Sequence, residues 1–276
     1  MTRPAVASGR RMLVAVLLAL SAAAIAQDQN ATADMFRASQ TPTAAPKPPS
    51  AAVQAVTELD RLSPEARLYG HAARRGDHIV VVAEIASAQL ELGHWQDGGS
   101  VDVRLLGPNQ TPAGTAHGAI LAGSRAAAVD VPLTQAGRGP WTASIHVNGA
   151  AELAVAIDVP SSASTLLGDP LIFRAQARPN APLHPVADFA FLRTERLHVE
   201  WPVLTPLDQR QARLLDQRGQ PLPVNASVIE TPDGATTMLA ADVVLTPLAA
   251  ATYVVEVTVG AGATTEQRYV AFRIAR

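Results

Sequence analysis

Short runs in which apolar and polar residues alternate dominate this chain. In residues 100–106, for example, Val101, Val103 and Leu105 alternate with Asp102. Successive side chains of a strand point to opposite faces, so this alternation predicts strands with one buried face. Comparable runs occupy residues 142–147, 197–201, 253–259 and 270–274, and residues 78–85 and 153–157 form strand-like runs that are apolar almost throughout. A period of two over so many segments excludes a helical bundle and favours antiparallel sheets.

Turn-forming residues separate these runs. They include Gly76-Asp77, Asp97-Gly98-Gly99, Gly107-Pro108-Asn109, Asn148-Gly149, Arg218-Gly219 and Pro232-Asp233-Gly234. Many short alternating strands joined by such turns are typical of an antiparallel β-sandwich.

An internal repeat predicts two copies of this unit. Residues 130–134 resemble residues 242–246 at an offset of 112, and Trp141 matches Tyr253 at the same offset. About 100 residues per copy is the size of an immunoglobulin-like sandwich. We therefore predict an all-β fold of two tandem immunoglobulin-like antiparallel β-sandwiches. Chance matching in an Ala- and Val-rich chain is the alternative explanation of the repeat.

The aromatic residue of the second copy has a predicted structural role. Leu248 lies five residues before Tyr253, and Ala251 lies two before it. This spacing is typical of a tyrosine corner, in which the hydroxyl bonds back to nearby backbone. Trp141 takes the tyrosine's place in the first copy, where the corner is degraded.

The N-terminal residues have the pattern of an export signal. Arg3, Arg10 and Arg11 precede an apolar run over residues 12–24, which ends in the small-residue pattern Ala24-Ile25-Ala26. This order predicts a bacterial signal peptide over residues 1–26 for the general secretion route. The mature protein is then periplasmic or secreted, with no stable membrane span after cleavage; an uncleaved anchor is the alternative.

The pattern divides the chain into six segments. They are the signal peptide (1–26), a disordered Pro/Ala-rich tether (27–50), a short helix and connector (51–67), the first sandwich (68–159), a linker (160–168) and the second sandwich (169–276). The helix is indicated by Ser50 as its N-cap and by apolar residues at every third position from Val53 to Leu62.

Composition excludes several chemistries. The chain has no cysteine, and its formal net charge is −2. Thiol catalysis and thiolate metal sites are therefore excluded, and no basic excess supports binding to nucleic acid. No Gly-x-Ser-x-Gly or His-Glu-x-x-His motif occurs among the seven histidines and the serines. The histidines are His71, His78, His94, His117, His146, His184 and His198. We expect no catalytic residue, no cofactor and no metal; a metal site built from histidines far apart in the sequence stays open.

Two positions deserve a binding interpretation beside a structural one. Trp95 precedes the turn at residues 96–99 and is the best candidate for an exposed ring that contacts a ligand, although a role in the core or at its rim is favoured. Arg75-Gly76-Asp77 spells an integrin-type tripeptide, but its place between two strand-like runs indicates a hairpin turn.

Three stretches carry a family resemblance. They are residues 71–85, residues 168–175 and, most closely, residues 191–197 followed by 213–219. Together they resemble the C-terminal region of secreted bacterial proteins related to von Willebrand factor A, described chiefly from Acidobacteria. The resemblance covers residues 68–276. In that family an A domain with a metal-dependent adhesion site precedes this region.

This sequence departs from the family in its N-terminal part. It has no Asp-x-Ser-x-Ser loop, and the residues before the first strand are too few for an A domain. The family's metal and adhesion function are therefore not transferred. We expect a non-catalytic exported interaction or spacer module of the bacterial cell envelope, whose partner is an unknown envelope or extracellular protein. The alternatives are a glycan or small-molecule binding module that uses Trp95 or the interdomain cleft, and a cryptic hydrolase.

Overall fold

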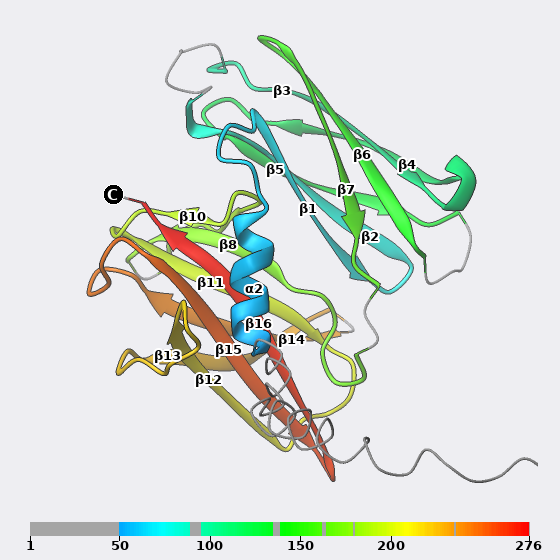
Figure 1. The fold of residues 1–276 in the computed structure, drawn as a ribbon. Helices are drawn as coiled ribbons and strands as arrows, with labels where there is room; N and C mark the ends of the chain where they lie inside the picture. Colours follow the sequence, from blue (N-terminus) through cyan, green and yellow to red (C-terminus); the bar gives the residue numbers. More distant parts are fainter. Residues whose placement is uncertain are drawn as a thin grey trace, which may run out of the picture. The chain divides into compact units, whose positions relative to one another are not determined.

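The computed structural model describes residues 50–88, 95–134, 139–161, 164–178, 180–234 and 236–275 (Figure 1). They belong to one compact unit, Pro49–Arg276. The expected signal peptide, the tether up to residue 49 and His94 lie outside the described residues. No helix within the described ranges has the length and apolar character needed to cross a bilayer.

The first sandwich consists of two antiparallel sheets. One sheet has the order β1 (Leu68–Arg75), β2 (His78–Ile85) and β5 (Ala126–Pro132). The other has the order β4 (Pro112–Ile120), β3 (Gly99–Leu106), β6 (Trp141–Asn148) and β7 (Glu152–Val159), with the short 3-10 helix η1 (Pro108–Gln110) between β3 and β4. The inward residues of both sheets, among them Ile79, Val103 and Ile145, form one buried core.

The second sandwich also has two sheets. One runs β13 (Ala226–Asp233), β14 (Thr236–Val244), β11 (Glu195–Val203), β8 (Leu171–Gln176) and β9 (His184–Pro185). The other runs β10 (Ala190–Phe191), β16 (Thr264–Ile274), β15 (Thr252–Ala261) and β12 (Gln209–Asp216). The pairing of β10 with β16 is parallel, and the other strand pairs of this sandwich are antiparallel. The predicted all-β sandwich fold is confirmed.

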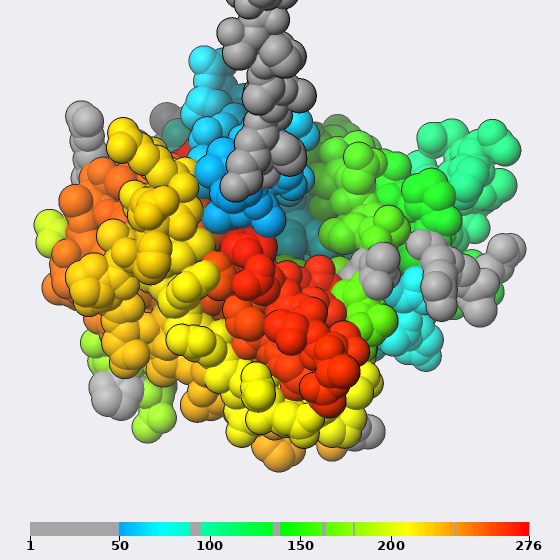
Figure 2. Space-filling model, turned by 60° about the horizontal axis from the view of Figure 1, so that its bottom comes forward, coloured from blue at the N-terminus to red at the C-terminus, as the bar shows by residue number. Residues whose placement is uncertain are grey.

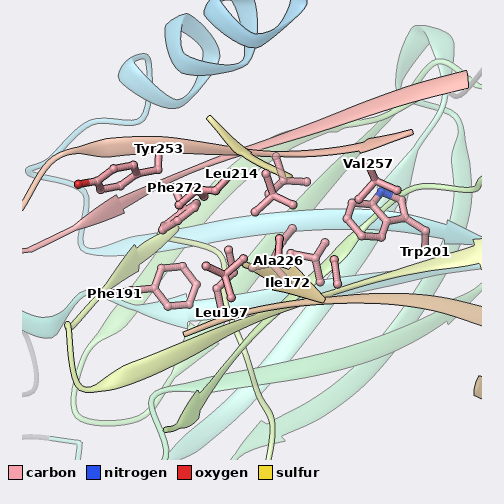
Figure 3. Close-up of a cluster of buried hydrophobic side chains, with 14 of the residues drawn as sticks. Ile172, Phe191, Leu197, Trp201, Leu214, Ala226, Tyr253, Val257 and Phe272 are labelled. Carbon is pink, nitrogen blue, oxygen red and sulfur yellow. The ribbon is translucent and has the colours of Figure 1, made fainter. Parts of the chain in front are cut away.

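A second buried core lies between the sheets of this sandwich. Trp201, Phe191 and Phe272 are its largest fully buried side chains. Figure 3 shows Phe191 and Phe272 beside each other, and their rings meet edge to face with centroids 5.8 Å apart. Alternate residues of β11, which include Leu197 and Trp201, supply this core, as the period of two predicts.

The sequence repeat falls on equivalent strand pairs. Leu105 of β3 faces Ala143 of β6, and Leu214 of β12 faces Val255 of β15. Ala143 and Val255 lie 112 residues apart, the offset of the repeat. The copies differ in the pairing of one strand, because β4 pairs with β3 in the first sandwich, whereas β13 pairs with β14 in the second. The second sandwich also has the short strands β9 and β10, which have no counterpart in the first.

Helix α2 (Ala51–Asp60) precedes the first sandwich in the chain but packs on the second. Ser50 caps it by accepting a hydrogen bond from the Val53 amide at 3.4 Å. Its buried Ala52 and Leu59 contact strands β15 and β16, and Figure 2 shows the blue helix against the red last strand. Arg273 of β16 donates to the Leu59 carbonyl (3.0 Å), so α2 ties the start of the described chain to its end.

Two leucines of the expected linker belong to the second core. Leu166 is 3% exposed and Leu167 is fully buried. Leu167 forms an isolated bridge with Val203, the last residue of β11. The second sandwich therefore begins a few residues before the expected start at residue 169. The alternation of apolar and polar residues cannot predict these two leucines, because they pack beside a strand and not within one.

Candidate functional site

Four charged side chains gather where the two sandwiches meet. Glu84 of β2 and Arg125 come from the first sandwich, and Arg174 of β8 and Asp188 come from the second. Arg174 Nη1 donates to Glu84 Oε1 (2.5 Å), and Arg125 Nη2 lies 2.7 Å from the same oxygen. Both arginines also donate to Asp188, each at 2.9 Å. We call these four residues the junction cluster.

Backbone groups complete the coordination of Glu84. Its side chain is fully buried, and its Oε2 accepts hydrogen bonds from the amides of Ala187 (2.6 Å) and Asp188 (2.8 Å). A buried carboxylate is tolerated only with such partners, because burial without them costs several kcal/mol. Burial raises the pKa of Glu84, and nearby Asp188 adds to this, while Arg174 and Arg125 lower it.

The junction cluster is electrically balanced. Burial alone would lower the pKa of Arg174, but Glu84 and Asp188 outweigh it and raise that pKa. Two guanidinium groups therefore face two carboxylates within the cluster, and at its edge Glu195 Oε1 lies 3.9 Å from Arg174 Nε. Because these charges satisfy one another, the arrangement is suited to holding two domains together rather than to moving protons or binding a free anion.

An apolar patch adjoins the cluster. Val80 and Val82 of β2 pack with Leu171 of β8 and with Ala187, and Phe173 is partly buried against them. These valines lie on the outer face of their sheet, where a single sandwich would leave them in water. Their burial between the sandwiches stabilises the junction through removal of apolar surface from water.

Residues 169–170, at the start of the second sandwich, also bind strand β1 of the first sandwich. Asp169 Oδ2 accepts from the Arg74 amide (3.1 Å), and its carbonyl accepts from Arg75 Nη1 (2.7 Å). His71 Nε2 lies 2.8 Å from the Pro170 carbonyl oxygen. Burial lowers the pKa of His71. Because a carbonyl oxygen can only accept, the Nε2–H of His71 donates to Pro170.

Two hollows open beside the junction. One, of about 490 Å³, is lined by members of the junction cluster together with Glu195, Phe191 and Leu192. The other, of about 920 Å³, is lined from the first sandwich by residues around Arg75 and His78 and from the second by residues around Glu200 and Met238. These hollows constitute the interdomain cleft expected from the sequence.

His198 forms a separate clasp on the outer face of β11. Its Nδ1 lies 3.0 Å from Asp242 Oδ1, and its Nε2 lies 2.9 Å from Glu200 Oε1. Burial alone would lower the pKa of His198, but the hydrogen bonds to Asp242 and Glu200 outweigh burial and raise the pKa to about 9. Its strand position, opposite to the inward Leu197 and Val199, predicts a solvent-facing side chain, whereas His198 is only 8% exposed. Its position on the outer face follows the alternation, and the flanking carboxylates cover it.

Trp95 occupies the first core. It is 3% exposed and packs with the residues between the two sheets. A Cβ at Gly149 would lie 2.5 Å from its ring carbon Cζ3, so the ring lies directly against that backbone. The exposed ring considered for ligand contact is thus not present, and the core role favoured by the sequence describes Trp95.

Tyr253 and Leu248 both lie in the second core. The Tyr253 hydroxyl donates to the Ala249 carbonyl at 3.0 Å, which is the backbone bond of a tyrosine corner. Arg75-Gly76-Asp77 joins β1 to β2, and Gly76 has the positive φ (+60°) that such a turn requires. The Arg75 side chain is engaged with Asp169, so only part of this tripeptide is free at the surface.

The strand pattern of the sequence does not predict the junction cluster. One signal was present, because Glu84 is the only acidic residue in the Val-rich run at 78–85. A charge at a buried strand position indicates a partner. Its partners come from segments about 40 to 100 residues away, which the strand pattern does not connect.

Comparison of the chain with protein-family models and with curated proteins found no match. The candidate site therefore rests on its own geometry.

Proposed function

We propose that this chain is an exported, non-catalytic interaction or spacer module of the bacterial cell envelope. The supporting observation is the junction, in which a buried, charge-balanced cluster and an apolar patch join the two sandwiches. A flexible tandem would leave Val82 and Glu84 in water. A spacer that holds two binding surfaces at a fixed separation needs such a seam.

The absence of cysteine permits a direct test of rigidity. Ser100→Cys on the first sandwich and Thr231→Cys on the second place one spin label at an exposed site of each. We expect a narrow distance distribution between the two labels, because the junction fixes them. Val82→Asp puts a charge into the apolar patch and should broaden the distribution, whereas Val244→Asp, at a half-exposed site, should not.

A broad distribution in the parent chain would contradict the spacer proposal. The interaction role is tested separately by capture from envelope extract on the immobilised mature chain. Enrichment of one protein or glycan, reduced by Val82→Asp but not by Val244→Asp, is the expected result. Turnover of ester, peptide or glycoside substrates by the purified chain would contradict the non-catalytic role.

The hollows favour a second candidate function, a binding module for a glycan or small molecule. The hollow of about 920 Å³ has mixed walls, in which Arg75, His78 and Glu200 lie among apolar side chains such as Leu171 and Met238. Pockets of this size hold small organic ligands. Saturation-transfer NMR with an oligosaccharide panel tests this role, and Glu200→Gln should weaken any binding found there. Signals that survive unchanged in this variant would place the ligand elsewhere.

A further inference from the structure

Two histidines and one aspartate form a row across the outer face of the first sandwich. Asp102 of β3 lies directly opposite His117 of β4 on one side and opposite His146 of β6 on the other. The neighbouring residues Val101 and Val103 point into the core, so the three polar side chains share the solvent face. We call His117, Asp102 and His146 the histidine row.

The spacing of the row suits a metal ion. Adjacent strands lie about 4.8 Å apart, so the two histidine Cα atoms are separated by about 10 Å with the aspartate midway. An imidazole reaches several ångströms beyond its Cα, and Zn–N bonds are about 2.0–2.1 Å long. A cation above the Asp102 carboxylate is thus within reach of an imidazole from each side. Two histidines and one carboxylate with open positions form a recurrent ligand set for divalent transition metals.

One half of the row is already assembled. His117 Nδ1 contacts Asp102 Oδ1, and these side chains are 85% and 38% exposed. His146 Nε2 instead lies 3.3 Å from Ser144 Oγ. Accordingly, within the described ranges no group of three His, Asp or Glu side chains converges on one point. Rotation of the His146 ring toward Asp102 completes the set, and its cross-strand neighbour on β7 is the small Ala154.

Nearby charges modulate this site. Arg104 lies two residues beyond Asp102 on the same face, and a cation there opposes metal binding. Its side chain is exposed, so solvent and salt screen the effect. Other histidines with carboxylate partners lack the second imidazole: His78 has Asp77 and Asp130, and His198 has Asp242 and Glu200.

We propose that His117, Asp102 and His146 bind one divalent transition-metal ion, of the Zn²⁺ or Cu²⁺ class, on the outer face of the β4-β3-β6-β7 sheet, with the remaining positions left to water or to a partner's ligand. This inference is independent of the proposed spacer function. It takes up the site of distant histidines that the sequence left open. Its physical basis is that sheet register brings together residues 15 to 44 positions apart.

Titration calorimetry with Zn²⁺ and with Cu²⁺ tests the proposal on the mature chain without an affinity tag. We expect one ion per chain. His117→Gln, Asp102→Asn and His146→Gln should each weaken binding at least about tenfold, since loss of a residue that only hydrogen-bonds to a metal ligand already costs about 10–100-fold in affinity. Arg104→Gln should strengthen it modestly. Cu²⁺ should bind more tightly than Zn²⁺ at the same ligands.

Matched controls are His78→Gln and His184→Gln, which remove described histidines outside the row, and His94→Gln, which removes the one outside the described residues. These variants should bind as the parent chain does. Because the three row residues are on the surface, their variants should fold, as circular dichroism can verify. Absence of binding, or equal weakening by a control variant, would overturn the proposal.

Discussion

At the scale of single residues, the clasp of His198 shows how a charge is kept on a sheet face. Asp242 and Glu200 contact its two ring nitrogens, and Arg196 Nε lies 3.3 Å from Asp242. The ring also lies 6.0 Å from that of Phe173, centroid to centroid. The imidazolium thus satisfies two carboxylates that would otherwise repel each other beside an apolar neighbour.

This clasp predicts a specific pH dependence. The pKa of His198 rises from its ordinary 6.5 to about 9 on folding. Between these two pH values the folded state therefore keeps a proton on His198 that the unfolded state has lost. Its stabilisation is complete below about pH 6.5 and decreases as the pH rises through 9. Urea unfolding at pH 6 and at pH 9.5 should therefore show a stability difference between the parent chain and His198→Gln that shrinks at the higher pH. A constant difference, or an NMR titration midpoint of His198 near 6.5, would contradict this.

At the scale of elements, helix α2 packs on a different sandwich from the one that follows it in the chain. The helix is followed directly by β1 of the first sandwich, yet Leu59 and Ala52 pack on β15 and β16 of the second. A ten-residue helix is marginal alone, so its stability comes from this packing.

Leu59→Ala should therefore release α2 without unfolding the sheets. Truncation of a buried leucine costs about 2–5 kcal/mol in a core, which exceeds what a short helix can retain in isolation. Hydrogen exchange of the α2 amides should accelerate strongly, while the amides of β15 stay protected. Glu58→Gln, at the exposed neighbouring position, serves as the control and should leave exchange unchanged. Equal protection of α2 in both variants would mean that the helix is held by other contacts.

Helix α2 and the strands with a clear apolar run could be predicted because their signals are local, whereas strands such as β4 and β13 have no such run. The run at 78–85 coincides with β2, and the Ser50 cap marks the start of α2. What could not be predicted depends on partners far away in sequence. Alternation places His146 on an outer face, but only the register sets it opposite Asp102. Likewise, Glu84 is conspicuous in its strand, but nothing local indicates that Arg174 pairs with it.

At the scale of the whole molecule, the junction should make the two sandwiches unfold together. Glu84→Ala removes the fully buried carboxylate between Arg125 and Arg174 and leaves Asp188 as the one carboxylate that both arginines contact. Loss of one partner from a buried ionic cluster costs about 3–5 kcal/mol. We expect calorimetry to show a lower melting temperature and a separation of one transition into two. Glu152→Ala, an exposed glutamate on β7, is the matched control and should melt as the parent chain does. A single, unshifted transition in Glu84→Ala would show that the cluster does not couple the sandwiches.

The packing of α2 on β16 has a consequence for the order in which the chain folds during synthesis. Synthesis from the N-terminus presents α2 early, but the surface that receives the helix includes β16 and Arg273, which are synthesised after the other described strands. Until then the helix has no docking site and stays open to proteases. Burial of α2 thus reports that synthesis of the chain has passed β16.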